Sequence, residues 1–155
     1  MHYLIRHGET GGNRLNRANE GDRGLPLNPD GERQAALLHE RLAEVGVDFR
    51  VPAAVSNQVR TQQTAELAGF STFVVNRFLG EVPTDEPERY VDDIKRGQVP
   101  HEAIEAALKL FENPPVEQIC FTHGGLIMGA FALQSPAESL YMPPFGSITP
   151  ISLRL

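Results

Sequence analysis

The stretch that decides the fold is YLIRHGET, residues 3–10, in which a short apolar run ends directly in Arg6 and His7. The apolar residues predict a buried strand, and the two polar side chains then stand at its carboxyl end. In sheets covered by crossover helices, ligand sites lie beyond this end of the strands. The stretch therefore indicates both a strand of a parallel sheet and a candidate site next to it.

A second stretch, QICFTHGG at residues 118–125, repeats the pattern. It predicts another buried strand, followed by His123 and Gly124. Because the carboxyl ends of parallel strands meet at one edge of a sheet, we expect His7 and His123 to belong to a single site.

The spacing of apolar residues along the rest of the chain predicts alternating strands and helices, with a long functional loop over residues 8–28. Val45 and Leu67 are expected to face inward from their helices. We expect strands at 2–6, 53–56, 72–75, 118–122 and 147–154. We expect helices at 32–46, preceded by a turn and helix-start signal at 28–31, and at 58–68, 88–95, 101–112 and 124–133. This alternation is typical of an α/β fold, here a three-layer α/β/α arrangement with a mostly parallel central sheet.

Composition and charge narrow the function classes. The 155 residues are expected to form one domain, 1–155, and the net charge of −6 disfavours nucleic acid or an anionic membrane as a partner. The chain shows no long apolar span and no signal-peptide pattern, so we expect a cytoplasmic protein. Its one cysteine, Cys120, excludes an intrachain disulfide and is interpreted as a buried small hydrophobic residue. The oligomeric state is not indicated.

The polar residues at the strand ends suit a phosphate group. Guanidinium groups, here those of Arg6 and Arg60, match phosphate oxygens with paired hydrogen bonds, and Gly124 leads into a helix whose first amides favour an anion. A neutral imidazole can attack phosphorus, while a second, protonated histidine can hold an oxygen of the same phosphate. The two histidines are therefore expected to differ in protonation state.

Four blocks of the sequence resemble, in order, the histidine phosphatase superfamily in its phosphoglycerate-mutase-like branch. They are LIRHGET at 4–10 followed by Asn13, LNPDGERQA at 27–35, SNQVRTQQTA at 56–65 and THGG at 122–125. The resemblance implies a covalent phosphohistidine on His7 and no metal or other cofactor. It implies that the phosphate is surrounded by Arg6, Arg60, His123 and Asn13, with Gly124 at the substrate, and that the general acid is Glu81.

Some positions depart from the family pattern. Gly12 stands where the family carries an aromatic residue, no hydroxyl residue occurs near Asn19, and the segment after Glu81 lacks the usual continuation. The long insertion that covers the pocket of most mutases is also missing. An open pocket favours hydrolysis, so we expect a phosphatase acting on a small phosphorylated substrate or a phosphoprotein.

Several alternatives stay open at this stage. The acid could be Glu88, Asp85 or Glu86, and the apolar residues 142–145 either pack in the core or line the mouth of the pocket. Other functions that fit are mutase-type phosphoryl transfer, a non-catalytic phosphate-binding module, and a hydrolytic metal site built from His7, His123 and a carboxylate. The remaining histidines, His2, His39 and His101, are interpreted as surface or structural residues.

Overall fold

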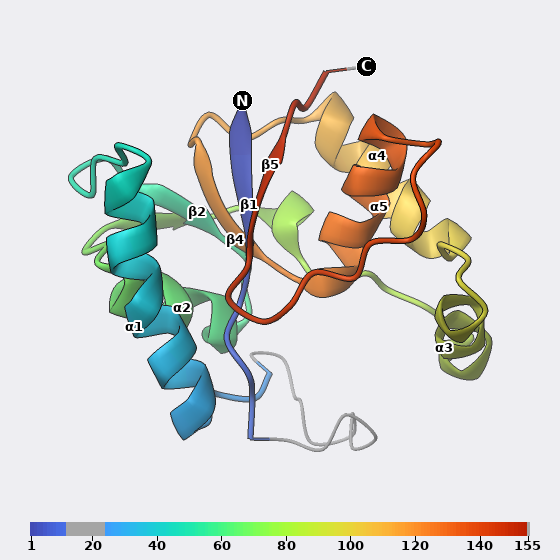
Figure 1. Cartoon of the computed structure of the whole chain (residues 1–155), viewed down its shortest axis with the longest axis horizontal. Coiled ribbons are helices and arrows are strands. Elements are labelled where there is room, and N and C mark those ends of the chain that lie inside the picture. Colours follow the sequence, from blue (N-terminus) through green and yellow to red (C-terminus); the bar gives the residue numbers. More distant parts are fainter. Residues whose placement is uncertain (12–23, 155) are drawn as a thin grey trace.

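The computed structural model describes residues 1–11 and 24–154, in which five strands form one sheet with the order β3-β2-β4-β1-β5 (Figure 1). The first four strands run parallel to their neighbours, and β5 runs antiparallel to β1. The mostly parallel sheet is thereby confirmed. The strands are β1 His2–Arg6, β2 Ala53–Val55, β3 Phe73–Val75, β4 Ile119–Thr122 and β5 Ile148–Ile151.

Helices cover both faces of this sheet, which confirms the three-layer arrangement. Helices α1 and α2 pack against each other on one side, α4 and α5 pack together on the other, and α3 lies farther out (Figure 1). No helix among the described residues is long and apolar enough to cross a membrane. The helices are α1 Pro29–Glu44, α2 Val59–Ala68, α3 Pro87–Lys95, α4 His101–Glu112 and α5 Gly124–Gln134, with a short 3₁₀ helix, η2, at Arg77–Leu79.

The core consists of two apolar clusters, one on each face of the sheet. Successive strand residues point to opposite faces, so Leu4 packs with the α4–α5 layer while Ile5 packs with the α1–α2 layer. Both side chains are fully buried. Burying a side chain of this kind contributes about 1.5–3 kcal/mol, and a strand buried on both faces has a continuous apolar sequence. Cys120 is buried as well, and burial raises the pKa of its thiol to about 12.

The helix-start signal at residues 28–31 is confirmed: helix α1 begins at Pro29, and the Asn28 side chain accepts a hydrogen bond from the Gly31 amide and caps the helix. Two positions expected to face inward need correction. Val45 and Leu67 are exposed, not buried. Val45 already belongs to the C-cap of α1. Leu67 lies off the buried stripe of α2, which consists of Arg60, Thr61, Thr64, Ala65 and Ala68.

The strand register brings the candidate residues to one edge of the sheet. Arg6 pairs with Thr122 at the ends of β1 and β4, and the His7 amide donates to the Thr122 carbonyl over 3.1 Å. Val55, the last residue of β2, pairs with Phe121 of β4. The loops that follow β1, β2 and β4 therefore start side by side.

Candidate active site

His7 and His123 meet where β1 and β4 end. Their ring centroids are 5.2 Å apart in an edge-to-face arrangement, and both side chains are buried. Sequence positions more than a hundred residues apart thus contribute to one site, as the two strand-end patterns indicate.

His7 is held in one tautomer. Its Nδ1 lies 2.6 Å from the Gly8 carbonyl oxygen, which can only accept, so Nδ1 carries the proton. Its Nε2 lies 3.2 Å from Nε of Arg60, a nitrogen that only donates, so Nε2 presents its lone pair. Burial is the main cause that lowers the pKa of His7 to about 3; the Gly8 hydrogen bond opposes this shift, and the charges of Arg60 and Arg6 add to it. His7 is therefore neutral at physiological pH.

His123 is also neutral but has the opposite tautomer. Its Nδ1 lies 3.4 Å from Nη2 of Arg60 and accepts, while its Nε2 lies 2.9 Å from Oγ of Ser56 and donates. Burial, and then the electrostatic influence of the His7 ring and the charges of Arg60 and Arg6, lower the pKa of His123 well below its ordinary value. The two neutral rings thus differ in tautomer, because burial and the two arginines lower the pKa of both.

Arg60 links the other residues of the site. It lies in the first turn of α2 and its side chain is 5% exposed. Besides the two imidazoles it contacts the Glu81 carboxylate, with Nη2 to Oε2 at 2.7 Å, and Nη1 donates to the Gln58 side chain at 3.2 Å. The Arg60 N–H groups thus converge on the lone pairs of two imidazole rings. A bound oxyanion can replace these ring nitrogens as the acceptor of the N–H groups.

Arg6 lies beside the same cluster and is held from another segment. Its Nη1 donates to the Pro143 carbonyl at 2.7 Å, and its Cζ lies 4.0 Å from the centre of the Phe145 ring. A Cβ on Gly124 would stand 3.0 Å from Nε of Arg6, so the glycine makes room for the guanidinium at the start of α5. Phe145 also lies 5.9 Å from the His7 ring, which favours the interpretation that it lines the pocket.

The position of Glu81 separates it from the rival acids. Its carboxylate is 43% exposed and pairs with Arg60. In the described part of the chain, Glu88, Asp85 and Glu86 form no hydrogen bond or ion pair with the histidines or with Arg60; Glu86 instead pairs with Arg89. Asn13 lies outside the described residues, as do Gly12 and Asn19.

Sequence reasoning did not assign a role to Ser56, Thr61 or Thr64. Ser56 accepts a hydrogen bond from Nε2 of His123. The Ser56 hydroxyl also lies 2.9 Å from the hydroxyl of Thr61, which donates to the Gln58 carbonyl. Thr64 accepts from the Gly8 amide at 3.1 Å and so fixes the loop after His7. All three belong to the block at 56–65, and their polar character within a buried face was the signal that could have revealed them.

The site geometry suits an anion better than a metal ion. A cation bound to His7, His123 and a carboxylate would have to stand where the Arg60 guanidinium now contacts all three. No group of three or more His, Cys, Asp or Glu side chains in residues 1–11 and 24–154 is arranged to hold a metal. The other histidines serve elsewhere: His2 bonds the Pro115 carbonyl, His39 the Ala68 carbonyl, and His101 lies on the surface.

Fold and site together define an α/β protein with two buried, strand-end histidines around an arginine. The sequence profile of the histidine phosphatase superfamily (branch 1) matches residues 2–82, which is half of the chain, and the protein therefore belongs to this family. Membership supports phosphatase or phosphoryl-transfer chemistry in general. A comparison with curated protein sequences gave no match.

Solved structures share the fold over nearly the whole chain. TTHB049 from Thermus thermophilus is 29% identical, with a TM-score of 0.65 over 94% of this chain and 89% of its own. YhfR from Bacillus stearothermophilus is 24% identical, with a TM-score of 0.63 over 94% and 87% of the two chains. The Rv3214 protein of Mycobacterium tuberculosis is 23% identical, with a TM-score of 0.58 over the same shares. The last two show likeness of fold alone.

Proposed function

We propose that this protein is a metal-independent phosphatase that hydrolyses phosphomonoesters or phosphoramidates through a covalent phosphohistidine on His7. The observation that carries the proposal is the neutral His7 ring, whose Nε2 lone pair faces the Arg60 guanidinium inside a buried site. A lone pair directed toward a fixed cation is the arrangement that an attack on a bound phosphate anion requires.

In the first step the substrate phosphate replaces the imidazole lone pairs as the acceptor for Arg60. A dianionic phosphate accepts more strongly than a neutral ring nitrogen, and its charge raises the pKa of His123, which then takes up a proton and donates to the phosphate. The freed Nε2 lone pair of His7 attacks phosphorus. The bond from phosphorus to the leaving oxygen breaks, and protonated Glu81 gives its proton to that oxygen.

In the second step the Glu81 carboxylate takes a proton from water as the water oxygen attacks phosphorus. The bond between phosphorus and Nε2 breaks, its electron pair returns to His7, and inorganic phosphate leaves. The 43% exposure of Glu81 supports water, rather than a second phosphorylated alcohol, as the acceptor. For this reason we favour hydrolysis over mutase-type transfer, with small phosphorylated molecules or phosphoproteins as the substrate class.

Rapid mixing of the protein with a ³²P-labelled aryl phosphate, followed by a quench in alkaline detergent, tests the proposal. We expect alkali-stable, acid-labile label on the wild type and none on His7→Ala, whose turnover falls on the order of 10⁴-fold or more. His2→Ala, which alters a histidine at the start of β1, should label normally. His7→Ala should still bind inorganic phosphate in a calorimeter, because Arg60 and His123 remain.

Two outcomes would count against this function. A wild type that binds inorganic phosphate but never becomes labelled would be a phosphate-binding module. Turnover that is lost on chelation and restored by zinc would identify a metal-dependent hydrolase instead.

A further inference from the structure

Hydrogen bonds on both sides of Glu81 fix the loop that carries it. Upstream, the Thr122 hydroxyl donates to the Leu79 carbonyl over 2.6 Å. Downstream, the Thr84 hydroxyl donates to Oε2 of Glu102 over 2.6 Å. Between these ties the side chain of Val82 is buried in the α4–α5 core cluster. The exposed carboxylate of Glu81 therefore stands on a short segment with three fixed points.

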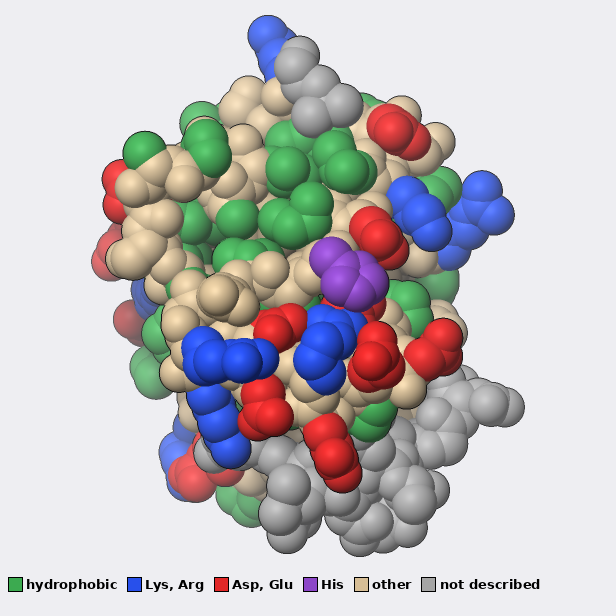
Figure 2. All heavy atoms as spheres, turned by 90° about the vertical axis from the view of Figure 1, so that its right-hand side faces the viewer, with side chains coloured by type: hydrophobic (Ala, Val, Ile, Leu, Met, Phe, Trp, Pro, Cys, Tyr) green, Lys and Arg blue, Asp and Glu red, His purple; other side chains and the backbone are tan. Residues whose placement is uncertain are grey.

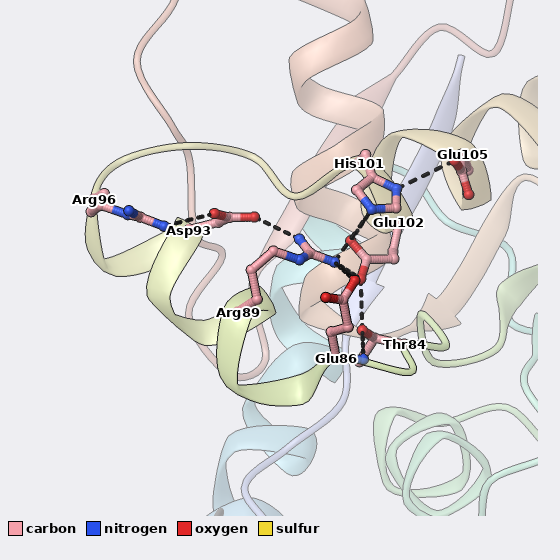
Figure 3. A network of polar contacts seen from close by, with 8 residues as sticks. All are labelled: Thr84, Glu86, Arg89, Asp93, Arg96, His101, Glu102 and Glu105. Atoms are coloured by element: carbon pink, nitrogen blue, oxygen red, sulfur yellow. Dashed lines mark hydrogen bonds and ion pairs between the residues drawn. The ribbon is translucent and has the colours of Figure 1, made fainter.

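The hydrogen bond from Thr84 ends in a partly buried ionic network between α3 and α4 (Figure 3). Glu102 lies in the first turn of α4, with its side chain 10% exposed. Arg89 of α3 pairs with it and also with Asp93 at 2.7 Å. The Thr84 hydroxyl donates to Glu102 and also accepts a hydrogen bond from the Glu86 amide at 3.0 Å, just before α3 begins. The loop, α3 and α4 are thus joined at one carboxylate.

Glu102, at the centre of this network, is ionised at neutral pH. Burial would raise the pKa of Glu102, but the hydrogen bonds from Thr84 and Arg89 outweigh it and lower the pKa to about 2. A hydrogen bond to an ionised acceptor is shorter and stronger than one between neutral groups, which suits Thr84 as a rigid tie. The face that bears α3 and α4 displays many interspersed acidic and basic side chains (Figure 2). Most of these are exposed, and exposed ion pairs contribute little to the free energy of unfolding.

We propose that Thr84, Glu102 and Arg89 are positioning residues, which hold the loop so that Glu81 reaches the leaving-group oxygen. The proposal rests on the function proposed above and assigns a catalytic consequence to a network outside the phosphate site. Thr84 is three residues from Glu81, so loss of its tie lets the carboxylate move relative to Arg60. A misplacement of about 1 Å can lower a rate on the order of a hundredfold.

The leaving group separates this role from simple support of the fold. A simple alkyl alcohol leaves poorly without a proton, whereas p-nitrophenolate leaves readily as an anion. Mispositioning Glu81 should therefore slow an alkyl phosphate and spare p-nitrophenyl phosphate. The value to compare is kcat/KM, because it reports the steps up to phosphoryl transfer and not the later hydrolysis of the phosphoenzyme.

The test uses Thr84→Val, which keeps the shape of the side chain and removes the hydroxyl. We expect kcat/KM to fall about ten- to hundredfold for glycerol 2-phosphate and less than about twofold for p-nitrophenyl phosphate. Thr84→Ser should restore the wild-type ratio. Arg96→Gln is the matched control, because it breaks an exposed ion pair with Asp93 in the same network without touching the Thr84 tie. It should leave both substrates unchanged.

A double-mutant cycle closes the argument. If Thr84 acts through Glu81, Thr84→Val should have almost no further effect in a Glu81→Gln background, and Glu102→Gln should reproduce the leaving-group pattern of Thr84→Val. Equal losses for both substrates, an unchanged ratio, or full additivity with Glu81→Gln would overturn the proposal. Turnover of p-nitrophenyl phosphate by the wild type keeps these results separate from a failure of the phosphatase function, whose absence would remove both.

Discussion

At the scale of single residues, the tautomer of His7 decides the chemistry. The Gly8 carbonyl fixes the proton on Nδ1 and leaves Nε2 as the reactive atom. Arg60 does the converse for His123: it donates to Nδ1, so the proton of that ring is on Nε2, which donates to the Ser56 hydroxyl. One arginine thus orients two imidazoles, and replacing it by a lysine would remove the planar set of donors that makes this geometry.

Nitrogen-15 NMR of histidine-labelled protein measures the protonation state of His7 directly. Because burial lowers its pKa to about 3, the ring should remain a neutral Nδ1–H tautomer from pH 8 down to pH 5. The absence of the signal in His7→Gln assigns it. Titration of this signal near pH 6.5 would show that the site does not shield the ring as described.

At the scale of elements, the close approach of two backbones places the His7 loop. The loop after β1 crosses the start of α1 so tightly that a Cβ on Gly8 would stand 2.5 Å from the Gly31 carbonyl oxygen. A Cβ on Gly31 would in turn meet the Glu9 backbone at 2.0 Å. Neither glycine tolerates a side chain because the atoms it would meet belong to rigid backbone.

Gly8→Ala should therefore lower the free energy of unfolding by about 1–3 kcal/mol, which urea denaturation can measure. Gly11→Ala is the control on the same loop, because among residues 1–11 and 24–154 its Cβ would come no closer than 3.8 Å to a neighbour. The two variants should differ clearly in their midpoints. Similar midpoints would mean that the loop and α1 are farther apart than described.

At the scale of the whole molecule, acid should destabilise the protein in two stages. Burial holds the pKa of His7 at about 3, below the value of 6.5 in an unfolded chain. Between these values the unfolded chain binds a proton that the native protein does not, so the free energy of unfolding falls as the pH drops. Glu102, with a native pKa of about 2 against 4.5, contributes stability above pH 4.5 that is lost as the pH falls toward 2.

Denaturation midpoints between pH 7 and pH 3 should separate the two stages. His7→Gln should make the decline between pH 6.5 and 4.5 less steep, and the part that remains is due to His123, whose pKa is also lowered in the native protein. Glu102→Gln should leave that interval as it is in the wild type and make the decline below it less steep. If the His7→Gln and wild-type curves run parallel from pH 7 to pH 4.5, the native site takes up protons as readily as the unfolded chain.

Patterns in the sequence were sufficient for the elements and for the pairing of the two histidine motifs. Continuous apolar runs predict strands buried on both faces, and such strands belong to a parallel sheet whose carboxyl ends gather at one edge. The placement of Arg60 was harder to predict from periodicity. It begins the buried stripe of α2, so a charged residue occupies a position that apolar spacing would assign to the core.

The sequence alone determined the α/β class, the resemblance to a family and the proximity of His7 to His123. These follow from apolar patterns and strand-end motifs, which consist of consecutive residues. Only the tertiary structure decided the sheet order, the two tautomers, the contact of Glu81 with Arg60 and the tie of its loop to Glu102. These depend on burial and on distances between segments far apart in the chain. The spacing of residues along the sequence specifies neither the burial of a side chain nor the distance between two segments.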